Sequence, residues 1–460
     1  MTLGDAAVLM KGELTGAGVA GRDFTGVSID SRTTEAGQLF FAIVGKSQDG
    51  HRFASEALVR GASGLVVQKS LEAPESAPVI RVSDTTVALQ ELARGVRLEA
   101  PVKVVAITGS MGKTTTKEAT AAALSARFSV LKSEGNLNNF YGLPLSLLRY
   151  RGEETAVVEL GMSAPGEIAR LTEIAVPDVG VLTNVAEVHR EFFPSVEAIA
   201  EAKGELFAGL REGAVAVVNA DDPLVMSQVR RFLGRKLSFG VASSADLRAE
   251  AVERTPAGTR FRARAGSDDA VVETALVGRH NVYNLLAALA SARALGIPLD
   301  EASKPLRTLG PVHGRGERRR FREGFLLIDE TYNSNPRALA SALEALQMET
   351  GERRIAVLGD MRELGERRET LHREAGREAA RSGVRMLIAV GALGRFMLEG
   401  ARESGLGDEI LFHRDEPEEA GRLLSDELRA GDVVLLKASR GVGLEKAIDV
   451  VRSRFTEERG

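Results

Sequence analysis

The middle of the chain alternates between two kinds of segment, which differ in length and in their pattern of hydrophobic and polar positions. From residue 102 onward, short apolar runs (VKVVAIT, TAVVEL, VGVLTN and GAVAVVN) are separated by longer amphipathic stretches. Strands that alternate with helices in this way form a parallel sheet with helices on both faces. The pattern predicts a buried strand over 102–107 and a helix over 113–128.

The same reading divides the whole chain. Before Pro101, short strands such as LFFAIV and GLVV are mixed with helical pieces, and over 246–278 alternating short strands interrupt the central pattern. A helix is expected over 281–295, followed by a linker. FLLID, RIAVLG, RMLIAVG and DVVLLK then predict a second doubly wound, Rossmann-like sheet. We therefore predict an α/β protein of three domains, at 1–100, 101–310 and 311–460.

Composition narrows the class of protein. The 460 residues carry a net charge of -4, which argues against a nucleic-acid partner held by a broad basic field. There is no cysteine, so disulfides and thiolate sites are excluded. The first residues, MTLGDAAVLMKGELTG, lack the pattern of a signal peptide, and no apolar run approaches about 18 residues. We expect a cytoplasmic monomer with no membrane partner.

The stretch VVAITGSMGKTTTKEAT carries the strongest chemical signal. A glycine-rich turn between a strand and a helix directs backbone N–H groups at one point, beside the positive end of the helix dipole. Lys113 adds a charge, and Thr114 adds a hydroxyl that suits Mg²⁺. The common P-loop has a glycine where this chain has Ile107, so the loop is a shorter variant. The alternative is a glycine turn beside a threonine-rich helix.

This short loop followed by TTTKE resembles the loop of the Mur ligase family, the ATP-dependent amide ligases of peptidoglycan precursor synthesis, and folylpolyglutamate synthetases share it. The resemblance implies that ATP is bound by the loop residues Thr108, Gly109, Ser110, Met111, Gly112, Lys113, Thr114 and Thr115.

Two polar residues lie at or after central strands, and a third lies on a predicted helix. Glu159 ends the strand TAVVEL, at the sheet edge where ligands collect. His189 in TNVAEVHREFF and Lys203 in AIAEAKGELF each have an ordinary alternative, as a structural histidine and a solvated lysine. The resemblance implies that Thr114 and Glu159 hold one Mg²⁺. It assigns a second Mg²⁺ to His189 and a carbamylated Lys203, and makes Lys113, His189 and Lys203 the catalytic residues.

The resemblance extends into the third domain. GRHNVYNLLAAL places Asn281 at the start of a helix, where the family contacts adenine, although a plain helix cap is the alternative. Arg315 of HGRGERR and Glu330 of LLIDETYNSNPRAL match residues that reach the nucleotide when the third domain closes. Family members of this branch usually read Asp-Asp-Ser-Tyr-Asn, so Glu330 departs by one methylene.

Three stretches resemble one branch of the family, which joins D-Ala-D-Ala to UDP-N-acetylmuramoyl-tripeptide. They are DETYNSNPRAL, VLGDMRELGERRETLHREAG and EGNLNNFYGLPLSLL. Residues 28–53 also resemble the family's UDP-binding domain. The expected contacts to the UDP-linked substrate are Ser31, Arg32, Asp49, His51, Asn138 and Asn139. The expected contacts on the side of the acceptor amine are Tyr332, Asn333 and Asn335.

The resemblance implies a reaction in two stages: ATP phosphorylates the terminal carboxylate of the tripeptide, and the amine of D-Ala-D-Ala attacks the acyl phosphate. Two alternatives stay open. One is a sibling ligase that adds another amino acid, although Asn335-Pro336-Arg337 matches a sibling motif only by coincidence, because it follows Ser334 inside the tyrosine motif. The other is a P-loop ATPase in which FLLIDE is the Walker B strand.

Overall fold

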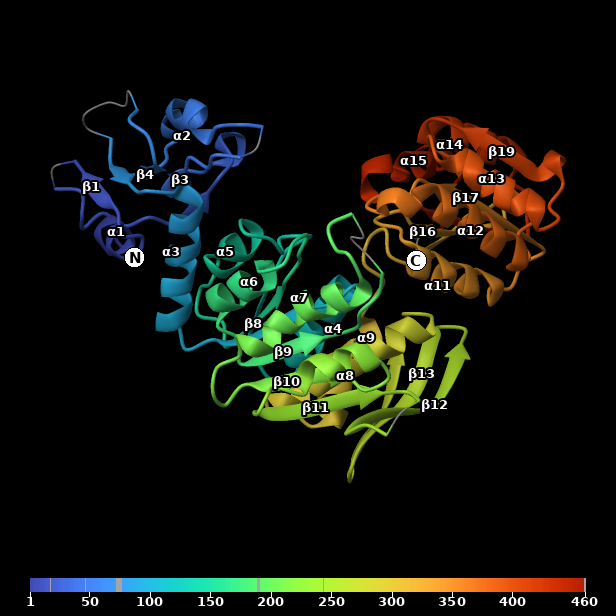
Figure 1. Ribbon diagram of the computed structural model, residues 1–460, viewed down its shortest axis with the longest axis horizontal. Coiled ribbons are helices and arrows are strands. Elements are labelled where there is room, and N and C mark those ends of the chain that lie inside the picture. The colour runs from blue at the N-terminus through green and yellow to red at the C-terminus, as the bar shows by residue number, and fades with distance from the viewer. Residues whose placement is uncertain (17, 46, 72–76, 188–190, 243, 459–460) are drawn as a thin grey trace.

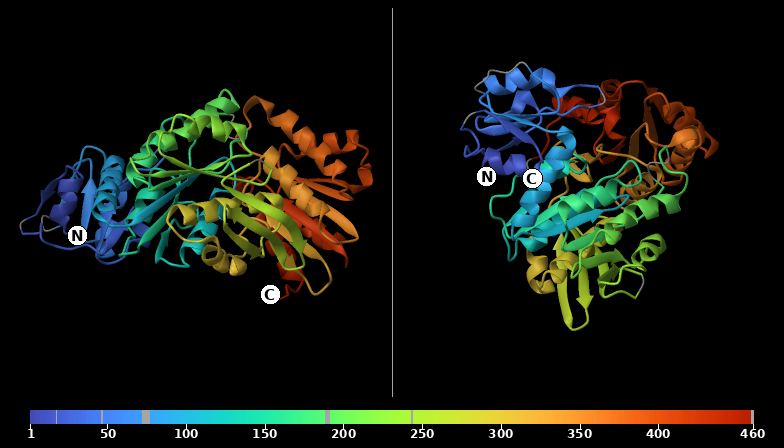
Figure 2. Two further views of the ribbon diagram at one scale, coloured as in Figure 1. Left: turned by 90° about the horizontal axis from the view of Figure 1, so that it is seen from below. Right: turned by 60° about the vertical axis from the view of Figure 1, so that its left-hand side comes forward.

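The computed structural model describes residues 1–458 with the exception of 17, 46, 72–76, 188–190 and 243. The chain forms three α/β domains, each built around its own sheet. In Figure 1 and in the left view of Figure 2, the N-terminal and C-terminal domains lie at opposite ends, with the central domain between them. The predicted fold class is confirmed.

The N-terminal domain is built around a small mixed sheet. Its strand order is β1-β5-β4-β3-β2, and only the β1–β5 pair is antiparallel. The elements are α1 (Leu3–Leu9), β1 (Glu13–Thr15), β2 (Gly26–Ser28), η1 (Ser31–Thr33), β3 (Gln38–Phe41), η2 (Gly50–Phe53), α2 (Ala54–Val59), β4 (Gly64–Val67), β5 (Val79–Arg81) and α3 (Thr85–Glu99).

The central domain contains one long sheet in the order β14-β13-β12-β11-β10-β9-β6-β8-β7. Its elements are β6 (Lys103–Thr108), α4 (Lys113–Leu124), β7 (Val130–Lys132), α5 (Gly142–Leu147), β8 (Thr155–Glu159), α6 (Glu167–Ala175), β9 (Val179–Leu182), α7 (Val196–Ala208), β10 (Val215–Asn219), α8 (Pro223–Val229), β11 (Arg235–Gly240), β12 (Leu247–Thr255), β13 (Gly258–Ala265), β14 (Asp268–Thr274), α9 (Arg279–Ala294), α10 (Leu299–Ser303) and η3 (Lys304–Thr308).

The strands over 246–278 continue this sheet. β12 pairs parallel with β11, and β13 and β14 then add antiparallel hairpins at the edge. The segment that interrupts the strand–helix pattern in sequence is therefore an extension of the same sheet in space. We call β12, β13 and β14 the edge arm.

The C-terminal domain has a sheet in the order β15-β16-β20-β17-β18-β19, antiparallel only between β15 and β16. Its elements are β15 (Glu317–Arg320), β16 (Leu326–Glu330), α11 (Pro336–Gln347), β17 (Arg353–Gly359), η4 (Gly365–Arg367), α12 (Arg368–Arg381), β18 (Met386–Val390), α13 (Gly394–Glu403), η5 (Asp408–Ile410), β19 (Leu411–Arg414), α14 (Pro417–Glu427), β20 (Asp432–Lys437), η6 (Arg440–Val442) and α15 (Glu445–Arg454).

Alternation along β6 explains why the central sheet is covered on both faces. Val104 and Ala106 belong to one hydrophobic core, while Val105 and Ile107 belong to the core beneath α4 and α9. Successive side chains of a strand point to opposite faces, so an unbroken apolar run needs helices on both sides. In the part of the chain that the structure describes, each helix is too short or too polar to cross a membrane.

The order of the strands determines where ligands collect. β6 lies between β8 and β9 and is parallel to both, so the segments after these three strands meet at one edge. The open edge at the carboxyl ends of parallel strands is the usual ligand site of such folds. The boundaries predicted at residues 100 and 310 fall in the connections before β6 and after η3, and they stay predictions.

Candidate nucleotide and metal site

Two glycines allow the turn between β6 and α4. Gly109 has φ +153°, and a Cβ atom there would lie 1.9 Å from Thr183 Oγ1. Gly112 has φ +79°, and a Cβ atom there would lie 2.3 Å from Asn284 Oδ1. Both positions therefore require glycine, for reasons of space as well as of backbone conformation.

The segment after β9 holds this loop in place. Asn184 accepts from Met111 N at 3.0 Å through Oδ1 and donates to Met111 O at 3.0 Å through Nδ2. Thr183 Oγ1 donates to the same carbonyl at 2.8 Å, and Ser110 Oγ accepts from Ala186 N at 2.8 Å. The carbonyl of Met111 is thus turned toward protein partners before any ligand arrives.

Lys113 is the first residue of α4, and its side chain extends back toward the loop that precedes the helix. Its Nζ donates to Gly109 O at 2.8 Å. Burial lowers the pKa of Lys113, and the negative charge of Glu159 opposes that shift. The ammonium therefore stands at the start of a helix, where the dipole and the loop N–H groups already favour an anion.

Glu159 ends β8 beside the first turn of α4. Its carboxylate accepts from Thr114 Oγ1 at 2.9 Å and from Asn138 Nδ2 at 2.8 Å, and the residue is 3% exposed. Both of these donors are neutral, and the positive charges that act on Glu159 come from Lys113 and Lys203. A carboxylate and a hydroxyl are oxygen ligands of the kind that Mg²⁺ prefers, so this pair fits the predicted metal.

Lys203 on α7 lies beneath the loop, not on the open cavity. It is 2% exposed, and its Nζ donates to Gly109 O at 3.1 Å. Burial, together with the charge of Lys113, lowers the pKa of Lys203 well below its usual value. A lowered pKa favours the neutral form of the amine, which is the form that carbamate formation needs. The companion prediction, His189, lies outside the described residues.

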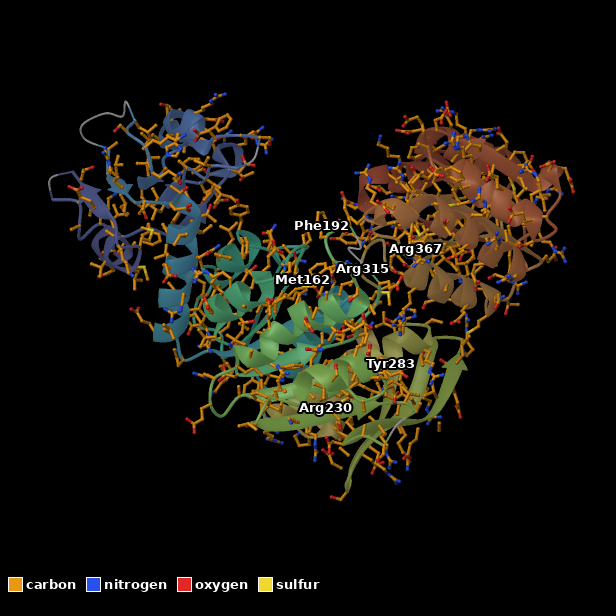
Figure 3. All side chains as sticks on the ribbon, viewed as in Figure 1. Met162, Phe192, Arg230, Tyr283, Arg315 and Arg367 are labelled. Carbon is orange, nitrogen blue, oxygen red and sulfur yellow. The ribbon has the colours of Figure 1, made fainter. Side chains whose placement is uncertain are left out.

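A cavity of about 1010 Å³ opens between the central and C-terminal domains. Met162, Tyr283 and Arg315, which Figure 3 labels, all line it and come from three distant parts of the chain. The predicted residues that it brings together are Ser110, Met111, Gly112, Lys113, Thr114, Thr115, Asn138, Asn139, Glu159, Asn281, Arg315, Glu330, Tyr332, Asn333 and Asn335. Thr108 is buried below it, where Oγ1 donates to Leu160 O at 2.9 Å.

The start of α9 closes the cavity beside the loop. Asn281 Nδ2 donates to Val277 O at 2.8 Å, and its Oδ1 accepts from Asn284 Nδ2 at 3.1 Å. Gly278 is the residue at the helix N-cap, so the expected alternative of a cap at Asn281 is not what the structure has. Asn284 in turn accepts from Thr116 Oγ1 at 3.2 Å, which ties α9 to α4.

The C-terminal domain contributes cations and a paired carboxylate. The guanidinium of Arg315 lies 4.1 Å from the ring centre of Tyr332, and its Nε is buried with no hydrogen-bond partner among the described residues. Glu330 Oε2 pairs with Lys437 Nζ at 3.1 Å. Lys437 also donates to Asn333 O at 3.0 Å, so it fixes two of the predicted residues.

Sequence reasoning missed Lys437, which is 2% exposed and lines the cavity. Its signal was present, because DVVLLK ends with a lysine at the carboxyl end of a parallel strand. Lys437 ends β20 just as Glu159 ends β8 in the central sheet. Arg279, Arg337, Arg362 and Arg440 also line the cavity and were not predicted.

Two predicted contacts have local structural partners. Asn335 caps α11 by accepting from Ala338 N at 2.9 Å. Asn139 accepts from Tyr141 N at 3.1 Å and Gly142 N at 2.9 Å at the start of α5. The side-chain oxygens of Asn139 and Asn335 already accept backbone hydrogen bonds, so each helix start is stabilised with or without a ligand.

The four predicted residues of the N-terminal domain do not line this cavity. His51 is buried, with Nδ1 2.6 Å from Asp49 Oδ1 and Nε2 accepting from Gln68 N at 3.1 Å. Ser31 Oγ donates to a glutamate, Glu56, at 2.8 Å, while Arg32 is exposed and pairs with Asp30. These residues organise two turns on their own domain.

Comparison with known families matches all three domains. The model described as "Mur ligase family, catalytic domain" matches residues 23–97, and "Mur ligase middle domain" matches 107–292. The model described as "Mur ligase, glutamate ligase domain" matches 314–440.

Curated relatives and solved structures of the same family resemble this chain over nearly its full length. UDP-N-acetylmuramoyl-tripeptide–D-alanyl-D-alanine ligase of Bacillus subtilis is 34% identical and covers 98% of each chain. Its Escherichia coli counterpart is also 34% identical and covers 99% of each. A crystal structure of MurF from Acinetobacter baumannii superposes with a TM-score of 0.90 at 29% identity, covering 98% of this chain and 99% of that one. MurF ligase from Thermotoga maritima in complex with ADP gives 0.82 at 33% identity, covering 94% and 97%.

Proposed function

Because this chain belongs to the Mur ligase family, we propose that it joins D-alanyl-D-alanine to UDP-N-acetylmuramoyl-tripeptide with the consumption of ATP. The observation that carries the proposal is that the phosphate loop, Glu159 and the third-domain residues Arg315 and Glu330 line one shared cavity. A nucleotide and a carboxylate substrate have to meet in such a place, and this cavity is built from two domains.

The loop and Lys113 bind the triphosphate in this proposal. Backbone N–H groups at the start of α4 and the ammonium of Lys113 neutralise charge as the γ-phosphate approaches a second anion, the substrate carboxylate. Thr114 and Glu159 would hold one Mg²⁺, which supplies further neutralisation of phosphate charge. Arg315, Glu330 and Asn281 complete the nucleotide contacts from the other wall of the cavity.

Lys203 would act as a carbamate. The neutral amine nitrogen bonds to the carbon of CO₂ and releases one proton, which yields an N-carboxylate anion beneath the loop. That anion would accept from Lys113 or hold the second Mg²⁺ together with His189. The underlying reason is electrostatic. An uncharged amine at Lys203 means that only one positively charged group, Lys113, lies at the Gly109 carbonyl.

The substrates would approach from the two ends of the molecule. The turns that carry Ser31, Arg32, Asp49 and His51 would hold the uridine diphosphate portion, and the loop with Asn138 and Asn139 its peptide. Tyr332, Asn333 and Asn335 would face the acceptor amine, which attacks the acyl phosphate with loss of inorganic phosphate. Closure of the domains would keep water from that intermediate. We also propose that the enzyme acts as a monomer in the cytoplasm.

An assay of ADP release tests the proposal directly. ADP should form over many turnovers only when UDP-N-acetylmuramoyl-tripeptide and D-Ala-D-Ala are both present, and mass spectrometry should find the pentapeptide product. Single amino acids in place of D-Ala-D-Ala test for a sibling ligase. Rapid ADP release without the UDP-linked substrate would instead support an ATPase and reject the ligase.

A further inference from the structure

The helix that begins at the phosphate loop carries a second lysine with no place in the proposed reaction. Lys117 lies one turn beyond Lys113 on α4 and is 1% exposed. Burying an ammonium costs free energy unless charge and hydrogen bonds compensate it, and an apolar side chain would fill the same space at lower cost. A specific role for the ammonium therefore has to be sought in its partners.

Two of those partners are carbonyls in the connection between β7 and α5, and the third is a carboxylate on α4 itself. Lys117 Nζ donates to Ser133 O at 2.6 Å and to Gly135 O at 3.4 Å, and it lies 3.1 Å from Glu118 Oε1. We call residues 133–139 the asparagine loop. The ammonium thus connects the first half of the asparagine loop to the helix that binds phosphate.

The second half of the asparagine loop reaches the carboxylate of the metal site. Asn138 Nδ2 donates to Glu159 Oε1 at 2.8 Å, and Asn138 O accepts from Gly161 N at 2.7 Å. A Cβ atom on Gly161 would lie 2.9 Å from Asn138 Oδ1, so the two segments pack without free space. A shift of the loop would therefore move the amide that orients Glu159.

We propose that Lys117 is a positioning residue that fixes the asparagine loop, and through Asn138 the Glu159 carboxylate, for metal and UDP-substrate binding. The inference rests on the proposed function, in which Glu159 holds Mg²⁺ and the loop faces the UDP-linked peptide. Residues that orient metal ligands from outside the coordination shell affect metal affinity by about 10- to 100-fold.

The test compares Lys117→Met with Lys132→Met. Lys132 also pairs with Glu118 but is exposed on β7, so its loss controls for the change of charge. Mn²⁺ is titrated by calorimetry into each protein loaded with a non-hydrolysable ATP analogue. Lys117→Met should lower the Mn²⁺ affinity about ten-fold and raise KM for the UDP-linked substrate. The metal-free affinity for the analogue should stay within about two-fold, and Lys132→Met should match the wild type.

A double-mutant cycle separates positioning from general destabilisation. If Lys117 acts through Asn138, then Asn138→Ala and the double variant should lose Mn²⁺ affinity to the same extent, because the second change has nothing left to remove. Fully additive losses would overturn the proposal, as would a Lys117→Met protein that binds Mn²⁺ like the wild type.

Gly135→Pro provides a second route if Lys117→Met does not fold. Gly135 is exposed with φ +51°, whereas proline holds φ near about −65°, so the Gly135 carbonyl, the more distant of the two that Lys117 contacts, has to move. The same loss of Mn²⁺ affinity supports the proposal, and an unchanged affinity overturns it. A wild type that binds analogue and Mn²⁺ but forms no product would reject the ligase function while leaving this binding test intact.

Discussion

Lys113 and Lys203 direct their ammonium groups at one backbone oxygen, the carbonyl of Gly109, at 2.8 and 3.1 Å. Two ammonium groups that share one carbonyl oxygen lie near each other, and positive charges this close repel each other away from bulk water. The positive charge of Lys113 accordingly contributes to the lowered pKa of Lys203, after burial itself. The arrangement favours one charged lysine and one neutral amine, which is the division of roles that the proposed chemistry requires.

Lys113→Ala should reduce kcat/KM by about 10²- to 10³-fold, which corresponds to about 3–4 kcal/mol of transition-state stabilisation. The reason is the loss of the charge that faces the phosphate as it is transferred. Steady-state assays beside Lys132→Ala, which removes an exposed lysine, measure the effect. Turnover near the wild-type level in Lys113→Ala would contradict the assigned role.

Lys203 should form a carbamate at pH values where ordinary lysines cannot. Only the neutral amine reacts with CO₂, and burial places the pKa of Lys203 well below 10.5. In ¹³C-bicarbonate, NMR should show a carbamate signal near pH 8 that Lys203→Ala lacks. The signal should persist as the pH falls and disappear once the amine becomes protonated. No Lys203-dependent signal at pH 8 would refute the carbamate.

At the scale of elements, the turn between β6 and α4 depends on the packing of α9 behind it. Gly112→Ala should weaken binding of an ATP analogue at least ten-fold, because its Cβ would meet Asn284 Oδ1 at 2.3 Å in a left-handed conformation that itself costs about 1–2 kcal/mol.

Gly166→Ala is the matched control for this change. Gly166 has φ +84° at the start of α6, and nothing lies within 4 Å of the position that a Cβ atom would take there. It therefore bears the backbone strain without the collision. Calorimetry on both variants should show a loss of affinity for the ATP analogue in Gly112→Ala alone. Equal affinities would indicate that the Asn284 side chain moves aside without weakening nucleotide binding.

The elements themselves followed closely from the sequence. The helix expected over 113–128 runs from Lys113 to Leu124, and the one expected over 281–295 runs from Arg279 to Ala294. Alternating apolar positions and the glycine turn decide such elements locally. The edge arm differs in this respect. The alternation of hydrophobic and polar residues predicts its strands, but their pairing with β11 depends on tertiary contacts that the local pattern does not specify.

At the scale of the molecule, an ionic cluster joins the edge arm to the C-terminal domain. Arg254 on β12 lies 2.7 Å from Glu349, which is 5% exposed and also pairs with Arg318 at 2.6 Å. Burial favours a higher pKa for Glu349, but hydrogen bonds from Arg318 and Arg254 outweigh it and lower the pKa. The carboxylate is thus a charged link between two domains.

Arg254→Ala should lower kcat/KM for ATP about five-fold, as expected for the loss of about 1 kcal/mol from a partly exposed ion pair that holds the two walls of the cavity together. Arg264→Ala is the control, since Arg264 lies on the same arm but pairs within its own domain, with Glu250 at 3.8 Å. High salt should reduce the difference between the two variants. Identical kinetics at low salt would show that this link does not support the cavity.

The sequence by itself determined the strand–helix elements, the short phosphate loop and the candidate ligands at strand ends, because each of these depends on neighbours within a few residues. Only the tertiary structure decided that Lys203 lies under the loop, that Lys437 pairs with Glu330 and that Lys117 reaches the asparagine loop. These contacts join residues on different elements, and burial and proximity of charge arise from packing rather than from local pattern. The residue type therefore predicts which chemistry each of these side chains is capable of. Its charge state and its partners depend on the tertiary structure.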